Sequence, residues 1–179
     1  HPCLGFYGII THSDGFVEYL SQHKRQIETK MAKSNKSTET LLVQLESLCT
    51  TNEQRNRYRD IESENDIYDK VNQCAKADDQ RLYRVLHSTR MLDTSLKLFL
   101  DIHRCRNGYS IGEYLDDLSK RNRGLLPLNG YLKQRFKEQI ANVRNKYMHS
   151  SNQFPRENDV NALVNSIHEC LQTVLNLRI

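Results

Sequence analysis

The chain has 179 residues, enough to bury the core of one domain, and 37% of them are hydrophobic. Its mean hydropathy of −0.73 and its net charge of +4 describe a polar chain that can still fold. The absence of Trp, with only seven Gly and three Pro, argues against a β-sandwich or barrel, which needs frequent turn residues.

The five cysteines are spread along the chain and form no Cys-x-x-Cys pair, which is typical of free thiols in a reducing compartment and not of a disulfide framework or a zinc site. No apolar run approaches the roughly 20 residues of a membrane span. The apolar opening, Leu4 to Ile10, lacks the length and basic leader of a signal peptide, and we expect a short strand or a packed arm there. The sequence predicts a soluble, cytoplasmic protein with no metal, cofactor or membrane partner.

Apolar residues spaced three and four apart predict helices along almost the whole chain. We expect a first helix over Phe16–Lys33. A short second helix follows, with an apolar face of Leu41, Leu42, Leu45 and Leu48. Thr50-Thr51-Asn52-Glu53 resembles a capping box for a third helix, whose weaker stripe is Tyr58, Ile61, Tyr68 and Val71.

The fourth helix has the clearest pattern, a seam suited to packing against neighbouring helices. Its members are Leu82, Val85, Thr89, Leu92, Leu96, Phe99 and His103. We expect His103 to be packed or hydrogen-bonded and not a ligand. Arg106-Asn107-Gly108 predicts a glycine cap at the end of this helix.

Three further segments complete the pattern. Ser110 to Glu113 predicts a capping box for a short helix through about Lys120, and Gly124 to Gly130 reads as a loop. A helix over about 131–149 then carries Leu132, Phe136, Ile140, Val143 and Tyr147 on one face. The last helix, from about Asp159, carries Val160, Leu163, Val164, Ile167, Leu171, Val174 and Leu175. Residues 1–179 are therefore expected to form a single all-α domain, a bundle of about five to seven helices.

Positive charge is concentrated in residues 120–146. This segment holds eight basic residues and one acid, Glu138, so it carries +7 and leaves −3 for the rest of the chain. A basic zone on an otherwise mildly acidic chain predicts a polyanion partner such as RNA; a solvated helix face is the plain alternative. The expected RNA-binding residues are Lys120, Arg121, Arg123, Lys133, Arg135, Lys137 and Lys146.

Arg144, Asn145 and His149 are the candidate catalytic residues, at the end of the expected 131–149 helix. An arginine can hold a phosphate, and an imidazole with a pKa near ~6.5 can move a proton. A pattern of Arg, then any four to six residues, then His arises about twice by chance in this composition. The second match, Arg81 with His87, sits mid-helix beside the seam, so we expect it to be structural.

Helical geometry separates the two catalytic candidates. At about 100° per residue, Arg144 and His149 point about 140° apart. They can meet only if the helix unwinds near His149, or if a second copy of the chain supplies one of them across a two-fold axis.

The segment from about 128 to 177 resembles the HEPN superfamily, whose ribonucleases carry Arg, a polar residue, three to five others and then His between two amphipathic helices. The resemblance implies a HEPN-like bundle that dimerises and a composite active site that acts as a metal-independent endoribonuclease on single-stranded RNA. His149 would deprotonate a 2′-hydroxyl, Arg144 would hold the phosphate, and Asn145 would orient His149 or bind the ribose or phosphate. Such proteins serve as toxins, phage-defence effectors or RNA-processing enzymes.

Three other interpretations remain open. The same fold can be a non-catalytic module that binds RNA, a nucleotide or a protein. It can be a toxin silenced by an antitoxin or other regulatory protein, although a partner that modifies a Tyr two residues after the His would meet Ser151 here. It can also be a helical scaffold that uses the seam from Leu82 to His103.

Overall fold

The computed structural model describes residues 38–73, 76–122, 127–149 and 153–178, and every regular element in these ranges is helical. This confirms the all-α bundle predicted from the sequence. The expected first helix (16–33) and the apolar opening lie outside the described residues. None of the described helices is long and apolar enough to cross a membrane.

The elements follow one another with short connections. Residues 38–47 are helical. They are followed by α2 (Asn52–Lys70), a 3₁₀ turn η1 (Val71–Gln73), α3 (Ala77–Ile102) and α4 (Ile111–Arg121). The chain then forms α5 (Gly130–Phe136), a π-helical segment η2 (Lys137–Asn142), α6 (Val143–His149) and α7 (Glu157–Leu175).

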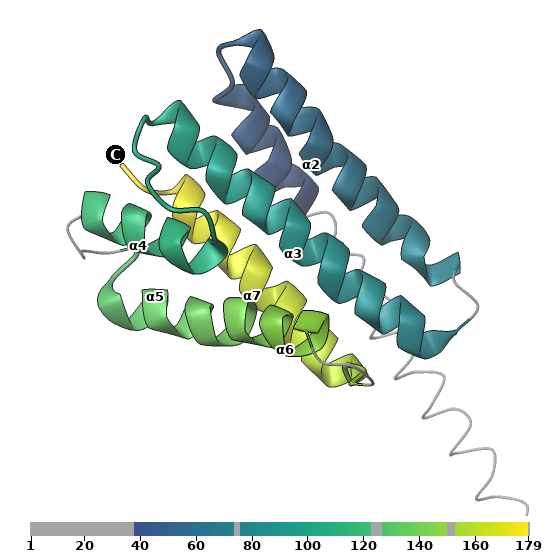
Figure 1. Ribbon diagram of the computed structural model, residues 1–179. Helices are drawn as coiled ribbons and strands as arrows, with labels where there is room; N and C mark the ends of the chain where they lie inside the picture. Colours follow the sequence, from purple (N-terminus) through teal and green to yellow (C-terminus); the bar gives the residue numbers. More distant parts are fainter. Residues whose placement is uncertain (1–37, 74–75, 123–126, 150–152, 179) are drawn as a thin grey trace, which may run out of the picture. The chain divides into compact units, whose positions relative to one another are not determined.

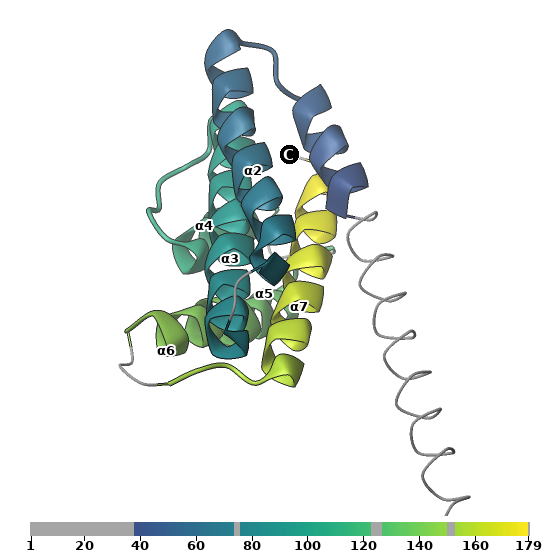
Figure 2. The same cartoon turned by 90° about the vertical axis from the view of Figure 1, so that its right-hand side faces the viewer.

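Helix α3 is the centre of the bundle, since it packs against α2, α4, α6 and α7 (Figure 1). Turning the molecule shows α3 and α7 side by side, with the 38–47 helix next to α7 (Figure 2). This position explains the long apolar seam: a helix with neighbours on several sides needs a wide buried face.

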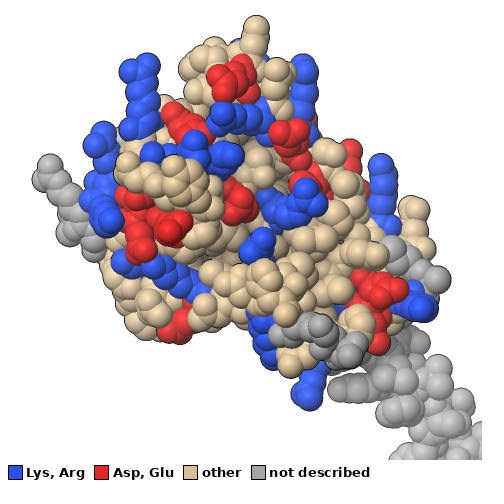
Figure 3. All heavy atoms as spheres, viewed as in Figure 1, with Lys and Arg blue, Asp and Glu red and all other residues tan. Residues whose placement is uncertain are grey.

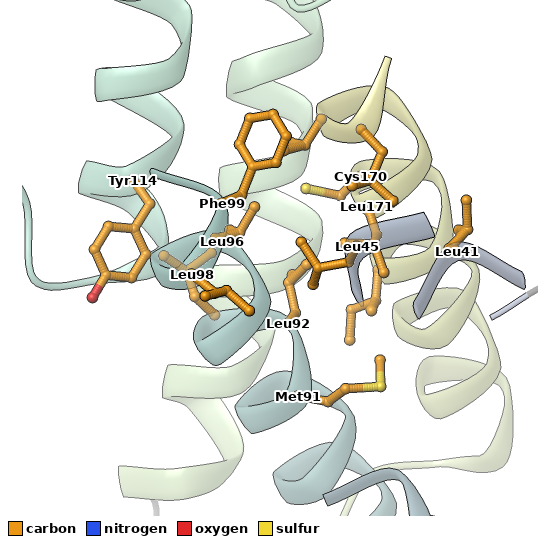
Figure 4. Close-up of a cluster of buried hydrophobic side chains, with 14 of the residues drawn as sticks. Leu41, Leu45, Met91, Leu92, Leu96, Leu98, Phe99, Tyr114, Cys170 and Leu171 are labelled. Carbon is orange, nitrogen blue, oxygen red and sulfur yellow. The ribbon is translucent and has the colours of Figure 1, made fainter. Parts of the chain in front are cut away.

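The middle of the seam forms the core as the sequence predicts, while its end residues Leu82 and His103 are only partly buried. Val85, Leu92, Leu96 and Phe99 are at most 2% exposed, and Leu92 lies with Leu45 and Leu171, which come from two other helices, in one cluster (Figure 4). The buried residues of α7 include the predicted stripe positions from Val160 to Leu175, apart from the partly buried Val164.

The end of α3 differs from the sequence prediction. The helix stops at Ile102, and Arg104 takes the left-handed conformation, with φ of 53°. The N–H of Cys105 bonds the carbonyl of Leu100 at 3.0 Å, and that of Arg104 bonds Asp101 at 3.1 Å, which is a Schellman motif without glycine. The predicted glycine cap at Gly108 was therefore wrong.

Gly108 serves another purpose, because the loop after α3 approaches α4 closely. A Cβ at this position would lie 2.4 Å from the Cβ of Glu113. The buried carboxylate of Asp117 accepts hydrogen bonds from the backbone N–H groups of Asn107 and Gly108, both at 2.8 Å. Glycine is needed here for close approach, not for a left-handed turn.

The N-terminal caps agree with the sequence with small shifts. Thr51 caps α2 in a capping box with Gln54, one residue beyond the predicted pair. Ser110 caps α4 by accepting from the N–H of Glu113, and Asn129 caps α5 by accepting from that of Leu132 at 2.9 Å. Each cap satisfies a backbone donor that the helix itself leaves without an acceptor.

The predicted helix over 131–149 is present as α5, η2 and α6 joined end to end. Its face buries Phe136, Ile140 and Tyr147, while Leu132 and Val143 are partly buried against the core. The π segment in the middle was not predicted. Such segments interrupt the regular register of a helix and often occur at functional sites, and this one ends directly before α6.

Candidate functional site

The three candidate catalytic residues all lie on α6. The helix keeps its α-helical conformation through His149, so the chain does not unwind at that residue. Arg144 and His149 therefore point about 140° apart on this short helix. A single copy of the chain does not bring their side chains together.

Arg144 and Asn145 border a hollow of about 320 Å³, which we call the Arg144 hollow. The side chains are linked, since the Arg144 Nη1 donates to the Asn145 Oδ1 at 3.3 Å. The hollow is formed by α6, η2, α3 and the start of α4, through Asp93, Tyr109, Ser110, Ile111, Gly112, Ala141, Arg144 and Asn145.

Asp93 is a residue of this site that the sequence did not indicate. Burial raises the pKa of its carboxyl above the ordinary value, although Arg144 and Lys97 pull in the opposite direction. An acid on the flank of an amphipathic helix is ordinary in sequence, so nothing in the pattern of α3 singles it out. Raised carboxyl pKa values often occur in functional sites.

His149 lies apart from the Arg144 hollow. Its side chain is exposed in the last turn of α6, and it does not border the hollow. An exposed imidazole at a helix end is accessible to a partner molecule, including a second copy of the chain.

Tyr147, between the two candidates, belongs to the core as predicted. It is 6% exposed, and its hydroxyl donates to the Asp159 Oδ2 of α7 at 2.9 Å. This hydrogen bond lowers the pKa of the Asp159 carboxyl. The ammonium of Lys146 lies 4.9 Å from the centre of the Tyr147 ring, a distance at which a cation–π contact is favourable.

The predicted basic zone is partly neutralised by acids from other elements. Lys133 and Lys137 share Asp116 of α4, at 3.1 and 2.6 Å. Although burial opposes it, their hydrogen bonds hold the pKa of Asp116 below its ordinary value. Arg135 pairs with Glu169 of α7.

The remaining basic residues are distributed differently. Lys120 and Arg121 are exposed at the end of α4, while Arg123 lies outside the described residues. On the face shown in Figure 3, basic and acidic side chains are interspersed. The +7 of the sequence segment therefore overstates the positive charge of the folded surface, because Asp116 and Glu169 lie outside that segment.

A larger hollow of about 540 Å³, the α2–α3 groove, shares Asp93 with the Arg144 hollow. Its lining is Arg57, Asp60, Glu64, Arg90, Asp93, Thr94, Lys97 and Leu98, so three basic and three acidic side chains face it. Arg57 also pairs with Asp101, and Arg90 with Glu64 at 3.1 Å. This balance of charge does not favour a polyanion.

The second Arg/His match has a structural place, as expected. The Nδ1 of His87 lies 2.7 Å from the Glu64 Oε2 and joins α3 to α2. The Nε of Arg81 donates to the carbonyl of Pro155 at 2.7 Å, just before α7. His103, at the end of the seam, packs its ring against Phe99 with centroids 4.5 Å apart.

Comparisons with family models, with curated proteins and with solved structures give no match to this chain. Within the described ranges, no three His, Cys, Asp or Glu side chains are grouped so as to hold a metal ion. The chemistry of the site is therefore inferred from the Arg144 hollow and the neighbouring turn of α6.

Proposed function

We propose that this chain is a metal-independent endoribonuclease that cleaves single-stranded RNA with Arg144, Asn145 and His149. The observation that carries the proposal is that the Arg144 guanidinium and the His149 imidazole are both open to a substrate. Arg144 borders a hollow and forms no ion pair with any described residue, unlike Lys133, Arg135 and Lys137. His149 is exposed at the end of the same helix.

The reaction needs a base and a group that holds the phosphate. His149 takes the proton of a ribose 2′-hydroxyl, and the 2′-oxygen attacks the adjacent phosphorus. The bond from phosphorus to the 5′-oxygen breaks, this oxygen takes a proton from water, and a 2′,3′-cyclic phosphate remains. Arg144 stabilises the charge on the phosphate oxygens, and Asn145 orients the guanidinium to which it is bonded.

The active site is proposed to be shared between two protomers. Because α6 is helical through His149, Arg144 and His149 of one protomer diverge. A two-fold axis near α6 would place Arg144 of one protomer opposite His149 of its partner. A ribonuclease of this kind would suit a toxin, a phage-defence effector or an RNA-processing enzyme, with an antitoxin or other regulatory protein as a further partner.

The test is cleavage of an end-labelled single-stranded RNA in EDTA by wild type, Arg144→Ala and His149→Ala. Arg55→Ala is the matched control, since Arg55 is an exposed arginine on α2. Wild type and the control should cleave and leave a cyclic phosphate, while the two site variants should lose about 10²-fold or more in rate. Circular dichroism checks that all four are folded. Equal cleavage by all four would refute the assignment.

A non-catalytic binding module is the second candidate. The pairing of Lys133 and Lys137 with Asp116 and of Arg135 with Glu169 favours the protein-binding form of such a module, because it leaves less free positive charge for RNA. RNA binding without cleavage, in wild type and both site variants, would support an RNA-binding module. Neither binding nor cleavage would point to a protein partner.

A further inference from the structure

Tyr109 is an aromatic residue presented to solvent from a fixed backbone. The residue is 85% exposed and lies in the loop between α3 and α4. The backbone is held at this position, since the N–H of Gly108 donates to Asp117 and the N–H of Tyr109 donates to the Glu113 Oε2, both at 2.8 Å. The loop therefore holds the backbone of an exposed ring in place without burying the ring.

Tyr109 borders the Arg144 hollow, together with Arg144 and Asn145. Tyr131, at the start of α5, is similarly exposed, at 77%. Unlike Tyr109, it borders neither this hollow nor the α2–α3 groove. Among the residues that the structure describes, these two tyrosines are the most exposed, and Tyr109 borders the same hollow as the candidate phosphate-binding arginine.

A flat ring beside an arginine suits the two parts of a nucleotide. Unpaired RNA bases stack on aromatic side chains, at about 1–3 kcal/mol per base, and a guanidinium binds phosphate through charge-assisted hydrogen bonds. The hollow, at about 320 Å³, is at the lower end of the ~300–1,000 Å³ of small-ligand sites. Its size fits one nucleotide better than a folded partner.

We propose that the Arg144 hollow is a subsite for one nucleotide of single-stranded RNA, in which Tyr109 stacks on the base while Arg144 holds the phosphate. This inference rests on the proposed action on RNA and names the substrate-binding residue that the sequence motif lacks. Both groups come from one protomer, so the subsite is complete before the partner adds His149. Because every base has a stacking face, the subsite tolerates all four bases.

The test measures binding of a short fluorescent RNA with 2′-O-methyl riboses, which cannot form the cyclic phosphate, by fluorescence anisotropy. Tyr109→Ala should raise Kd by about 5- to 150-fold, which is the stacking energy of one base converted to an affinity ratio. Tyr109→Phe should keep the wild-type Kd, because the ring is retained. Tyr131→Ala is the matched control and should bind as wild type does.

An RNA with abasic positions separates stacking from a structural effect. On this RNA, wild type and Tyr109→Ala should bind alike, since no base is present to stack; a persisting difference would overturn the stacking role. Equal binding of the normal RNA by wild type and Tyr109→Ala would overturn the subsite alone. Wild type that binds no RNA would overturn the proposed function as well, with Tyr109 then a contact for another kind of partner.

Discussion

Asp93 of α3 and Arg144 of α6 border one hollow without forming an ion pair in the described part of the chain. Burial raises the pKa of Asp93 more than Arg144 and Lys97 lower it. The carboxylate therefore gains less from the arginine than it loses by leaving water. Arg144 is left with a guanidinium that a phosphate can engage.

Replacing Asp93 with Asn should stabilise the protein at neutral pH. A raised pKa means that the folded state binds the proton more tightly than the unfolded state does, so the free energy of unfolding falls as pH rises from the ordinary carboxyl pKa to the raised one. Asp93→Asn has no carboxyl at this position and does not lose stability in this way. Urea unfolding over a pH series should therefore give the variant a higher free energy of unfolding than wild type at neutral pH, and the difference should close in acid. A variant less stable than wild type at neutral pH would contradict the expectation.

Mixing two inactive variants should restore activity if the site is shared between protomers. In a mixed dimer of Arg144→Ala and His149→Ala, one composite site has both groups intact and the other has neither. Random exchange makes about half of the dimers mixed, so we expect about a quarter of wild-type cleavage. Each variant alone is the control. No recovery after verified subunit exchange would show that the two groups act from the same protomer.

Periodicity was enough to predict the helices of the described residues, because the core of this bundle is built from single helix faces. Positions such as Leu92 and Leu96 recur at the spacing of one face, and both are fully buried. The positions of Thr51 and Ser110 as caps likewise follow from residues within one turn. Such local features need no knowledge of the neighbouring helices.

The surroundings of the site could not be predicted, since they depend on contacts between distant segments. Asp116 and Glu169 form ion pairs with Lys137 and Arg135, respectively, two residues that the sequence analysis assigned to RNA binding. Asp93 and Tyr109 reach the Arg144 hollow from α3 and from the loop before α4, and neither stands out in its own segment. The motif indicates Arg144, Asn145 and His149, but tertiary packing decides which other residues lie beside them.

Substituting Gly108 should destabilise the junction of α3 and α4. In Gly108→Ala, the new Cβ would lie 2.4 Å from the Glu113 Cβ and 3.0 Å from its carbonyl carbon. Relieving this overlap should cost about 1–3 kcal/mol of unfolding free energy. Gly130→Ala is the matched control, because a Cβ there meets nothing within 4 Å, and it should be neutral or up to about 1 kcal/mol stabilising. Urea unfolding measures both, and a neutral Gly108→Ala would show that the loop can move away.

Removing the Tyr147 hydroxyl should weaken the tie between α6 and α7 without disturbing the proposed chemistry. Tyr147→Phe keeps the buried ring but loses the 2.9 Å hydrogen bond to Asp159. The free energy of unfolding at neutral pH should therefore fall by about 1 kcal/mol. Tyr131→Phe, on an exposed ring, should change nothing.

The same bond gives the effect of Tyr147→Phe a pH dependence. Because the hydrogen bond lowers the pKa of folded Asp159, its stabilisation is present above the ordinary carboxyl pKa of 3.8 and is lost as pH falls through the lowered one. The gap between wild type and variant should therefore close in strong acid. RNA cleavage at neutral pH, well below the unfolding temperature, should stay within about twofold of wild type, since small changes in stability leave a folded site populated. A large loss of cleavage with unchanged stability would instead place the Tyr147 hydroxyl in the reaction.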